Sequence, residues 1–579
     1  MKIFCRRAII ETIVGYYTHL YPNKSKKSRR EWFAIAIECA SYTHCEARKG
    51  LFFTLDEAVL RTHRTLGVSR KAEDRLFVYT FRVWAPRADS VHLVGDFVGW
   101  EKGRPMTALA HGVWEYHLTT EAPLEGLKYK YKLFSRDKSF YHTDPYAWQC
   151  ESADSAASVI CTENRFHFQD NVWLSHRQEK PQPFHLYEIN AATWRTHNSR
   201  PADEAFAVYG YRELADALTP YVKGLGYTHV AFSQDMLAGL SHMAPPARHG
   251  GFEDFLYFVN KLHTNGVGVL YPFPVIDLRN EAQESICSYH CPNLTAYLLL
   301  TLLHFAEDCH IDGFFLKGTD NVEALSLAAF VAKEFKRLHP ESLLLYEGEH
   351  FEGEQTFDFV SDSSKENEIL RYLTCDPFFR RYHHASLAIG KPRLWCEAEN
   401  CDRTMMSSFF GNYEEKFATM RLYHAYRFFH PSALVSRMGN ELAPFTPRKR
   451  DAELEWFLLD FSMHRRYFNF VKEANTLYLE NKSLHAGKCR VLYENANDNT
   501  IVIERKTENE TLLGVFNFSA ILLPDHYLPI SLNCHEIFST DSVAFGGSGQ
   551  ENTRKNLAEQ NGIVLDIPPL SAVILKSLS

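Results

Sequence analysis

Ile311-Asp312-Gly313-Phe314-Phe315-Leu316-Lys317 is the stretch that decides the fold of this chain. It is a short, mostly apolar run, which is typical of a buried β-strand. Residues 322–337 follow with the spacing of an amphipathic helix, and residues 343–346 form a second apolar run. This pattern predicts two parallel strands joined by a helix.

The same strand–helix unit recurs on the N-terminal side of this stretch. Strands are expected at residues 186–189, 229–232 and 266–270, and helices at residues 211–223, 252–263 and 294–306. Repeated units of this kind predict a parallel sheet closed into a (β/α)8 TIM barrel. We place the barrel at residues 180–475.

Two β-rich segments flank the predicted barrel. Short strand-like runs separated by turn residues predict an N-terminal β-sandwich at residues 76–165. Short strands return over residues 476–579 and predict a C-terminal all-β sandwich. Residues 1–75 form a separate N-terminal segment, which we expect to be partly helical because residues 53–66 have helical spacing of apolar side chains.

Composition excludes several classes of function. The 579-residue chain has a net charge of −8, so we expect no nucleic-acid partner. No apolar run reaches the roughly 18 residues that a membrane span needs. Thirteen cysteines are scattered without framework spacing, which favours reduced thiols and a cytoplasmic location. Cys287 and Cys291 lack a second ligand pair, so we expect no metal site and no cofactor.

Several ordered motifs show a resemblance to a known family. They are Trp84-Ala85-Pro86, Gly95–Trp100, Tyr211–Asp216, Leu225–Val230, Phe357-Asp358-Phe359, Asp376–His384, Met438–Glu441 and Thr540–Gly549. With these motifs the chain resembles glycogen (1,4-α-glucan) branching enzymes of the α-amylase superfamily over roughly residues 52–579. The resemblance implies an N-terminal carbohydrate-binding module and a barrel that transfers α-1,4-glucan segments to form α-1,6 branches.

The catalytic positions implied by this resemblance are only partly kept. Retaining glycosyl transfer needs two carboxyl groups about 5 Å apart, one to attack the sugar and one to protonate the leaving oxygen. Glu347 is similar to the family's acid/base and Asp402 to its third carboxylate. Lys317 stands in place of the nucleophile, Phe315 in place of the arginine that orients it, and Cys401 in place of a histidine.

Other features of the predicted mouth also differ from the family pattern. The aspartate and histidine expected after the third strand are missing near Pro272 and Asp277. As alternative nucleophiles we consider Asp320, Asp235 and Glu349. Asp320, however, resembles the start of the family's next helix. The loops that would build the glucan groove are shortened, while the strands and helices are kept.

The replacement at Lys317 has a chemical consequence. A lysine here could pair with Glu347 or Asp402 and would then favour an ionised carboxylate at a position that needs a proton donor. Positive charge is also unfavourable beside a transition state with oxocarbenium character. We therefore expect impaired or absent catalysis.

The predicted N-terminal module has its own candidate site. Trp100 and Lys130 match positions where an aromatic face stacks on glucose and a polar group fixes a hydroxyl, with Phe140 or Tyr141 as a weaker third. The alternative for aromatic residues here is a place in the sandwich core, which we favour for Trp84 and Trp114.

Three functions remain open on the sequence alone. The first is a catalytically impaired or inactive homologue (a pseudoenzyme) that binds glycogen, a maltooligosaccharide or a protein partner. The second is an active α-glucan transferase or hydrolase with a non-standard nucleophile. The third is a structural or assembly subunit.

Overall fold

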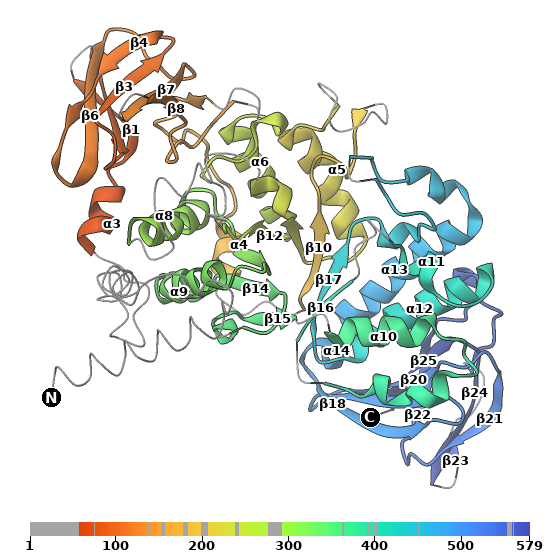
Figure 1. The fold of residues 1–579 in the computed structure, drawn as a ribbon. Coiled ribbons are helices and arrows are strands. Elements are labelled where there is room, and N and C mark those ends of the chain that lie inside the picture. Colours follow the sequence, from red (N-terminus) through yellow and green to blue (C-terminus); the bar gives the residue numbers. More distant parts are fainter. Residues whose placement is uncertain are drawn as a thin grey trace, which may run out of the picture.

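Figure 1 shows the protein as a computed structural model, in which the N-terminal sandwich and the C-terminal sheets lie on opposite sides of the barrel. The structure describes residues 57–73, 76–135, 138–151, 157–177, 183–197, 207–237, 243–275, 292–351, 353–361, 364–390, 393–397, 403–449, 451–552, 558–559 and 561–578.

The N-terminal module consists of two antiparallel sheets that follow helix α3 (Glu57–His63). One sheet has the order β1 (Gly67–Glu73), β2 (Leu76–Trp84), β6 (Val113–Thr120) and β5 (Thr107–Ala108). The other has the order β4 (Gly99–Pro105), β3 (Ser90–Gly95), β7 (Lys128–Ser135) and β8 (Lys138–His142), with β9 (Ser158–Val159) also paired to β7. Alternate residues such as Phe81, Leu93 and Tyr131 fill the space between the sheets.

Eight parallel strands form the barrel sheet. In chain order they are β10 (His185–Ile189), β11 (His229–Phe232), β12 (Gly268–Pro272), β13 (Gly313–Lys317), β14 (Leu343–Glu347), β15 (Phe359–Ser361), β16 (Leu394–Cys396) and β17 (Ala433–Arg437). Their order in the sheet is β15-β14-β13-β12-β11-β10-β17-β16. The end strands β15 and β16 lie next to each other, so the barrel is nearly closed.

Helices follow most barrel strands and cover their outer faces. They are α5 (Tyr211–Gly224), α6 (Phe252–His263), α8 (Pro292–Leu303), α9 (Val322–Leu338), α10 (Ser364–Thr374), α11 (Met405–Ser408), α12 (Tyr413–Phe429), α13 (Ser462–Glu480) and α14 (Lys482–Ala486), while the short α4 (Asn171–His176) precedes β10. The helices expected at 211–223, 252–263, 294–306 and 322–337 are confirmed, with small shifts at their ends. Asn321 begins α9 because its side chain accepts a hydrogen bond from the Ala324 backbone N–H at 3.1 Å.

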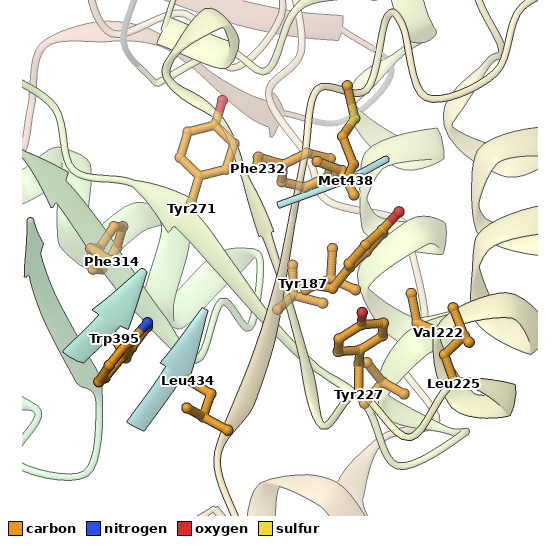
Figure 2. Close-up of a cluster of buried hydrophobic side chains, with 14 of the residues drawn as sticks. Tyr187, Val222, Leu225, Tyr227, Phe232, Tyr271, Phe314, Trp395, Leu434 and Met438 are labelled. Atoms are coloured by element: carbon orange, nitrogen blue, oxygen red, sulfur yellow. The ribbon is translucent and has the colours of Figure 1, made fainter. Parts of the chain in front are cut away.

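Successive side chains of a barrel strand point alternately inward and outward, so they form two cores, one inside the barrel and one between the strands and the helices. Inward positions are mostly aliphatic and include Leu186, Phe315, Leu345 and Val435. Outward positions pack under the helices; Figure 2 shows Val222 and Leu225, at the end of α5, beside Tyr227 and Tyr187. Gly313 allows close pairing, because a Cβ at this position would lie 2.1 Å from the backbone oxygen of Leu343 on β14.

The C-terminal part is all β. One antiparallel sheet has the order β18 (Lys488–Asn495), β19 (Thr500–Lys506), β20 (Thr511–Asn517), β25 (Ser571–Ser577) and β22 (Cys534–Ser539). The second has the order β21 (Leu523–Leu528), β24 (Gly562–Ile567) and β23 (Ala558–Glu559). The predicted fold class, two β-sandwiches flanking a (β/α)8 barrel, is confirmed.

The described ranges contain no helix long and apolar enough to cross a membrane. Seven cysteines fall within them, and all seven are free thiols. Cys287 and Cys291 lie outside the described residues.

Candidate active site

Four charged side chains stand at the carboxyl ends of four barrel strands. Glu188 lies two residues after Leu186, whose side chain faces into the barrel. In the same way, two residues after an inward-facing side chain, the chain has Lys317 on β13, Glu347 on β14 and Arg437 on β17. Because alternate residues of a strand share a face, each of the four belongs to the inner face of the barrel. They form its mouth, the end at which barrel enzymes carry their active sites.

The four side chains are joined by salt bridges. Lys317 Nζ lies 2.8 Å from Glu188 Oε1. Arg437 Nη2 donates to both oxygens of Glu347, at 2.6 and 2.5 Å, while its Nη1 pairs with Glu188 Oε2. Glu188 is also the backbone neighbour of Arg437, and Lys317 that of Glu347. The salt bridges therefore link the β10–β17 wall of the barrel to the β13–β14 wall.

The two inner members of this group are nearly inaccessible to water. Glu188 is 4% exposed and Arg437 is 6% exposed. Burial lowers the pKa of Arg437 to about 9, so the guanidinium remains charged at pH 7. The buried carboxylate of Glu188 and the partly buried carboxylate of Glu347 are compensated by this cation and by Lys317, which is the condition for keeping ions inside a protein.

A second buried ion pair holds Arg437 in place. The backbone N–H of Arg437 donates to Glu397 Oε2, and its Nε donates to the Glu397 backbone oxygen, both at 3.1 Å. Glu397 in turn pairs with Arg427 of α12 and accepts from Asn440 Nδ2 at 2.9 Å. The side chain of Arg437 is thus fixed on Glu347 by contacts from both β16 and α12.

The residues predicted from the resemblance are placed as follows. Lys317 and Glu347 are brought together at the mouth, where Lys317 pairs with Glu188, a residue that the sequence analysis did not consider. Phe315 is 2% exposed and fills the barrel interior. Asp402 and Cys401 lie outside the described residues, as does Asp277.

The alternative nucleophiles do not join this group in the described structure. Asp320 is exposed and directly precedes the Asn321 cap of α9, as its resemblance to a helix start suggested. Glu349 is exposed, and its backbone oxygen accepts from Tyr346 Oη at 2.6 Å. The side chain of Asp235 is outside the described set.

Sequence reasoning missed Glu188, Arg437 and Glu397. Glu188 and Arg437 could have been noticed, because each is a charged residue within a strand whose five residues are all buried. A charge in such a strand is rare unless it is paired or functional. Finding its partner, however, required the closure of the barrel.

The second candidate site lies on the β4-β3-β7-β8 sheet of the N-terminal module. Trp100 is half-buried, and its Nε1 donates to Asp96 Oδ1 at 3.0 Å. Tyr141 Oη donates to the Trp100 backbone oxygen at 3.2 Å, and Lys132 Nζ lies 5.3 Å from the Tyr141 ring centre. Lys130 shares a face of β7 with Lys132, so the predicted residues lie on one side of this sheet.

Comparisons with known proteins agree with this architecture. Residues 65–147 match carbohydrate-binding module 48 (isoamylase N-terminal domain), and residues 492–577 match the α-amylase C-terminal all-β domain. The 1,4-α-glucan branching enzyme GlgB of Protochlamydia amoebophila is 27% identical over 86% of this chain and 80% of its own length. That of Aquifex aeolicus is 27% identical over 86% of this chain and 94% of its own length.

The chain is a distant relative of the 1,4-α-glucan branching enzymes, within the α-amylase superfamily. Solved structures with low sequence identity share its fold. The group B Streptococcus pullulanase SAP superposes with a TM-score of 0.70 at 14% identity, covering 89% of this chain and 88% of that chain. At this identity the likeness concerns the fold alone.

Proposed function

We propose that this protein is an α-glucan-binding homologue of branching enzymes whose barrel no longer transfers glucan segments. The observation that carries the proposal is the set of salt bridges among Glu188, Lys317, Glu347 and Arg437. These contacts involve both positions that the reaction would need at the mouth, namely the nucleophile position, now Lys317, and the proton donor Glu347.

The nucleophile is the first group affected. A retaining transferase needs a carboxylate at the end of β13 to form the covalent sugar intermediate. Lys317 offers no carboxylate, and its Nζ is held in a salt bridge with Glu188 at 2.8 Å. Each 1.36 kcal/mol added to the barrier slows a reaction about tenfold, so loss of this path is severe.

The proton donor is the second group affected. Glu347 must carry a proton to release the leaving oxygen. Both of its oxygens accept hydrogen bonds from Arg437 Nη2, and a cation in direct contact with a carboxylate favours the ionised form. The geometry therefore opposes acid catalysis independently of the missing nucleophile.

Glucan binding is supported by the N-terminal module. The match to carbohydrate-binding module 48 and the common face of Trp100, Lys130 and Tyr141 favour stacking of a glucose ring on this sheet. We propose glycogen or a maltooligosaccharide as the ligand. The free thiols of the described cysteines are consistent with a reducing, cytoplasmic setting.

A branching assay tests the catalytic part of the proposal. Purified full-length protein is incubated with amylose, and the iodine stain is followed beside the Aquifex aeolicus relative as a positive control. We expect an unchanged stain and no new reducing ends. A fall in the stain that Glu347→Gln abolishes would overturn the proposal in favour of an active transferase.

Co-sedimentation with glycogen tests the binding part. We expect the wild-type chain to sediment and Trp100→Ala to sediment less, while Tyr527→Ala, an exposed aromatic of the C-terminal part, serves as the matched control. A wild-type chain that stays in solution at all glycogen concentrations would favour a structural or assembly role instead.

A further inference from the structure

We infer that a second α-glucan-binding surface lies on the segment between α10 and β16. It is formed by Phe378, Phe379, Arg381 and Tyr382, which we call the aromatic platform. The inference rests on the proposed glucan-binding function and assigns it a second site, away from both the barrel mouth and the N-terminal module.

The aromatic platform presents three large rings to solvent. Phe378 is 61% exposed, Phe379 is 50% exposed and Tyr382 is 68% exposed. Phe378 and Phe379 meet edge to face with ring centres 5.3 Å apart. Exposed apolar side chains are common singly, but a contiguous group of aromatic rings indicates a binding surface.

A planar cation lies between two of these rings. The guanidinium carbon of Arg381 is 4.4 Å from the Phe378 ring centre and 5.0 Å from that of Tyr382. Within the described residues, no carboxylate lies within salt-bridge distance of Arg381. Its charge is therefore balanced by the ring faces, a cation–π arrangement. The platform combines apolar faces with N–H donors in one small area.

The backbone beneath the platform is held rigidly. Arg380 is fully buried and donates to the backbone oxygens of Leu373, Cys375 and Phe518 at 2.9, 3.1 and 2.8 Å. Asn499 Nδ2 of the C-terminal part donates to the Pro377 oxygen at 3.0 Å. Because the rings stand on a fixed support, a ligand would not have to order the chain, which lowers the cost of binding.

The size of the platform argues against a protein partner. Three aromatic side chains of about 150–250 Å² each, half to two-thirds exposed, present roughly 350 Å². A stable protein interface needs about 800 Å² on each partner. The exposed neighbours Arg371, Thr374 and His383 are polar and do not extend the apolar area.

A sugar chain fits this chemistry better. The two faces of a glucose ring carry C–H groups that stack on aromatic rings, and its hydroxyls accept hydrogen bonds from a guanidinium. The segment joins a helix to the following strand, which places it at the amino end of the barrel, opposite the mouth. Binding here is therefore compatible with a mouth crossed by salt bridges.

Titration calorimetry with maltoheptaose and co-sedimentation with glycogen, both on the full-length chain, test this inference. Phe378→Leu and Tyr382→Leu keep apolar bulk but remove the rings, and Arg381→Lys keeps the charge but removes the planar donor. We expect each ring variant to weaken binding about three- to tenfold. We expect an additive loss with Trp100→Ala, and no change with Tyr527→Ala.

The outcomes separate this inference from the proposed function. Ring variants that bind like the wild type, while Trp100→Ala loses binding, would overturn the aromatic platform and leave the proposed function standing. A wild-type chain that binds neither glucan would overturn both. A ring variant with unchanged glucan binding but altered oligomeric size in gel filtration would assign the surface to a second copy of the chain. Thermal midpoints equal to that of the wild type show that the variants are folded.

Discussion

Lys317 Nζ on β13 lies 2.8 Å from Glu188 Oε1 on β10, so a salt bridge spans the mouth of the barrel between strands that are not neighbours in the sheet. Arg437 on β17 makes a second such link to Glu347 on β14. In each link a cation on one wall meets a carboxylate on the other. Every one of the four charges is thus compensated across the opening.

Restoring an aspartate at the end of β13 should not restore catalysis. Lys317→Asp would place a third carboxylate beside Glu188 and Glu347, with Arg437 as the remaining described cation. We expect the free energy of unfolding to fall by about 1–3 kcal/mol, a range that allows for the 24% exposure of the Lys317 side chain. Urea denaturation measures this, and Lys317→Met, which adds no negative charge, should lose less. Branching activity in Lys317→Asp would contradict the role given to Arg437.

Removing the central cation should be more costly. Arg437→Met leaves Glu188 and Glu347 without their shared partner, and breaking a buried pair costs about 3–5 kcal/mol. The double variant Arg437→Met/Glu347→Gln should recover part of this loss, because the amide carries no charge. A double variant no more stable than Arg437→Met would show that the Glu347 contact contributes little. Chemical denaturation of the two variants and the wild type provides the comparison.

The amino end of the barrel carries a histidine between two buried aspartates. His263 Nδ1 lies 2.8 Å from Asp170 and its Nε2 lies 2.9 Å from Asp312. Burial acts to lower the pKa of His263, but the two carboxylates outweigh it and the pKa is raised. Burial acts to raise the pKa of each aspartate, but His263 and the neighbouring hydrogen-bond donors, among them His310 at Asp170 and Trp173 at Asp312, outweigh it and both pKa values are lowered.

These shifts define a pH window for stability. The contribution of His263 is fully present below its ordinary pKa of 6.5 and is lost as the pH rises through the raised value. That of the aspartates is present above 3.8 and is lost as the pH falls through their lowered values. We expect the wild type to exceed His263→Gln in free energy of unfolding most clearly between pH 3.8 and 6.5. Equal pH profiles for the two proteins would contradict this.

Glu441 should make the protein less stable as the pH rises towards neutrality. It is 3% exposed and accepts from Tyr187 Oη at 2.7 Å and from Tyr221 Oη at 2.6 Å. Burial raises its pKa to about 7, against these two hydrogen bonds, so folded-state stability falls as the pH rises from 4.5 through 7. Glu441→Gln should remove this fall and be about 2–3 kcal/mol more stable at pH 8. Thermal denaturation at pH 4 and pH 8 checks the difference, which should vanish at pH 4.

The sequence was a good guide wherever periodicity reflects burial. Phe252–His263 has the spacing of an amphipathic helix and forms α6 with those bounds, because one face must pack on the barrel. Lys317 and Glu347 could be placed on neighbouring strand ends because parallel strands align their carboxyl ends. For Glu188, however, the sequence predicted only a place in a strand. The neighbouring residues do not indicate which cation its side chain contacts.

The sequence by itself determined the two sandwiches, the parallel barrel between them and the absence of a carboxylate at position 317, since these follow from local pattern and residue identity. Only the tertiary structure decided that Lys317 meets Glu188 and that Arg437 holds Glu347, because the partners lie 129 and 90 residues apart in the chain. Closure of the sheet brings β10 and β17 opposite β13 and β14. The charges then have to pair, because a buried, unpaired ion is too costly to keep.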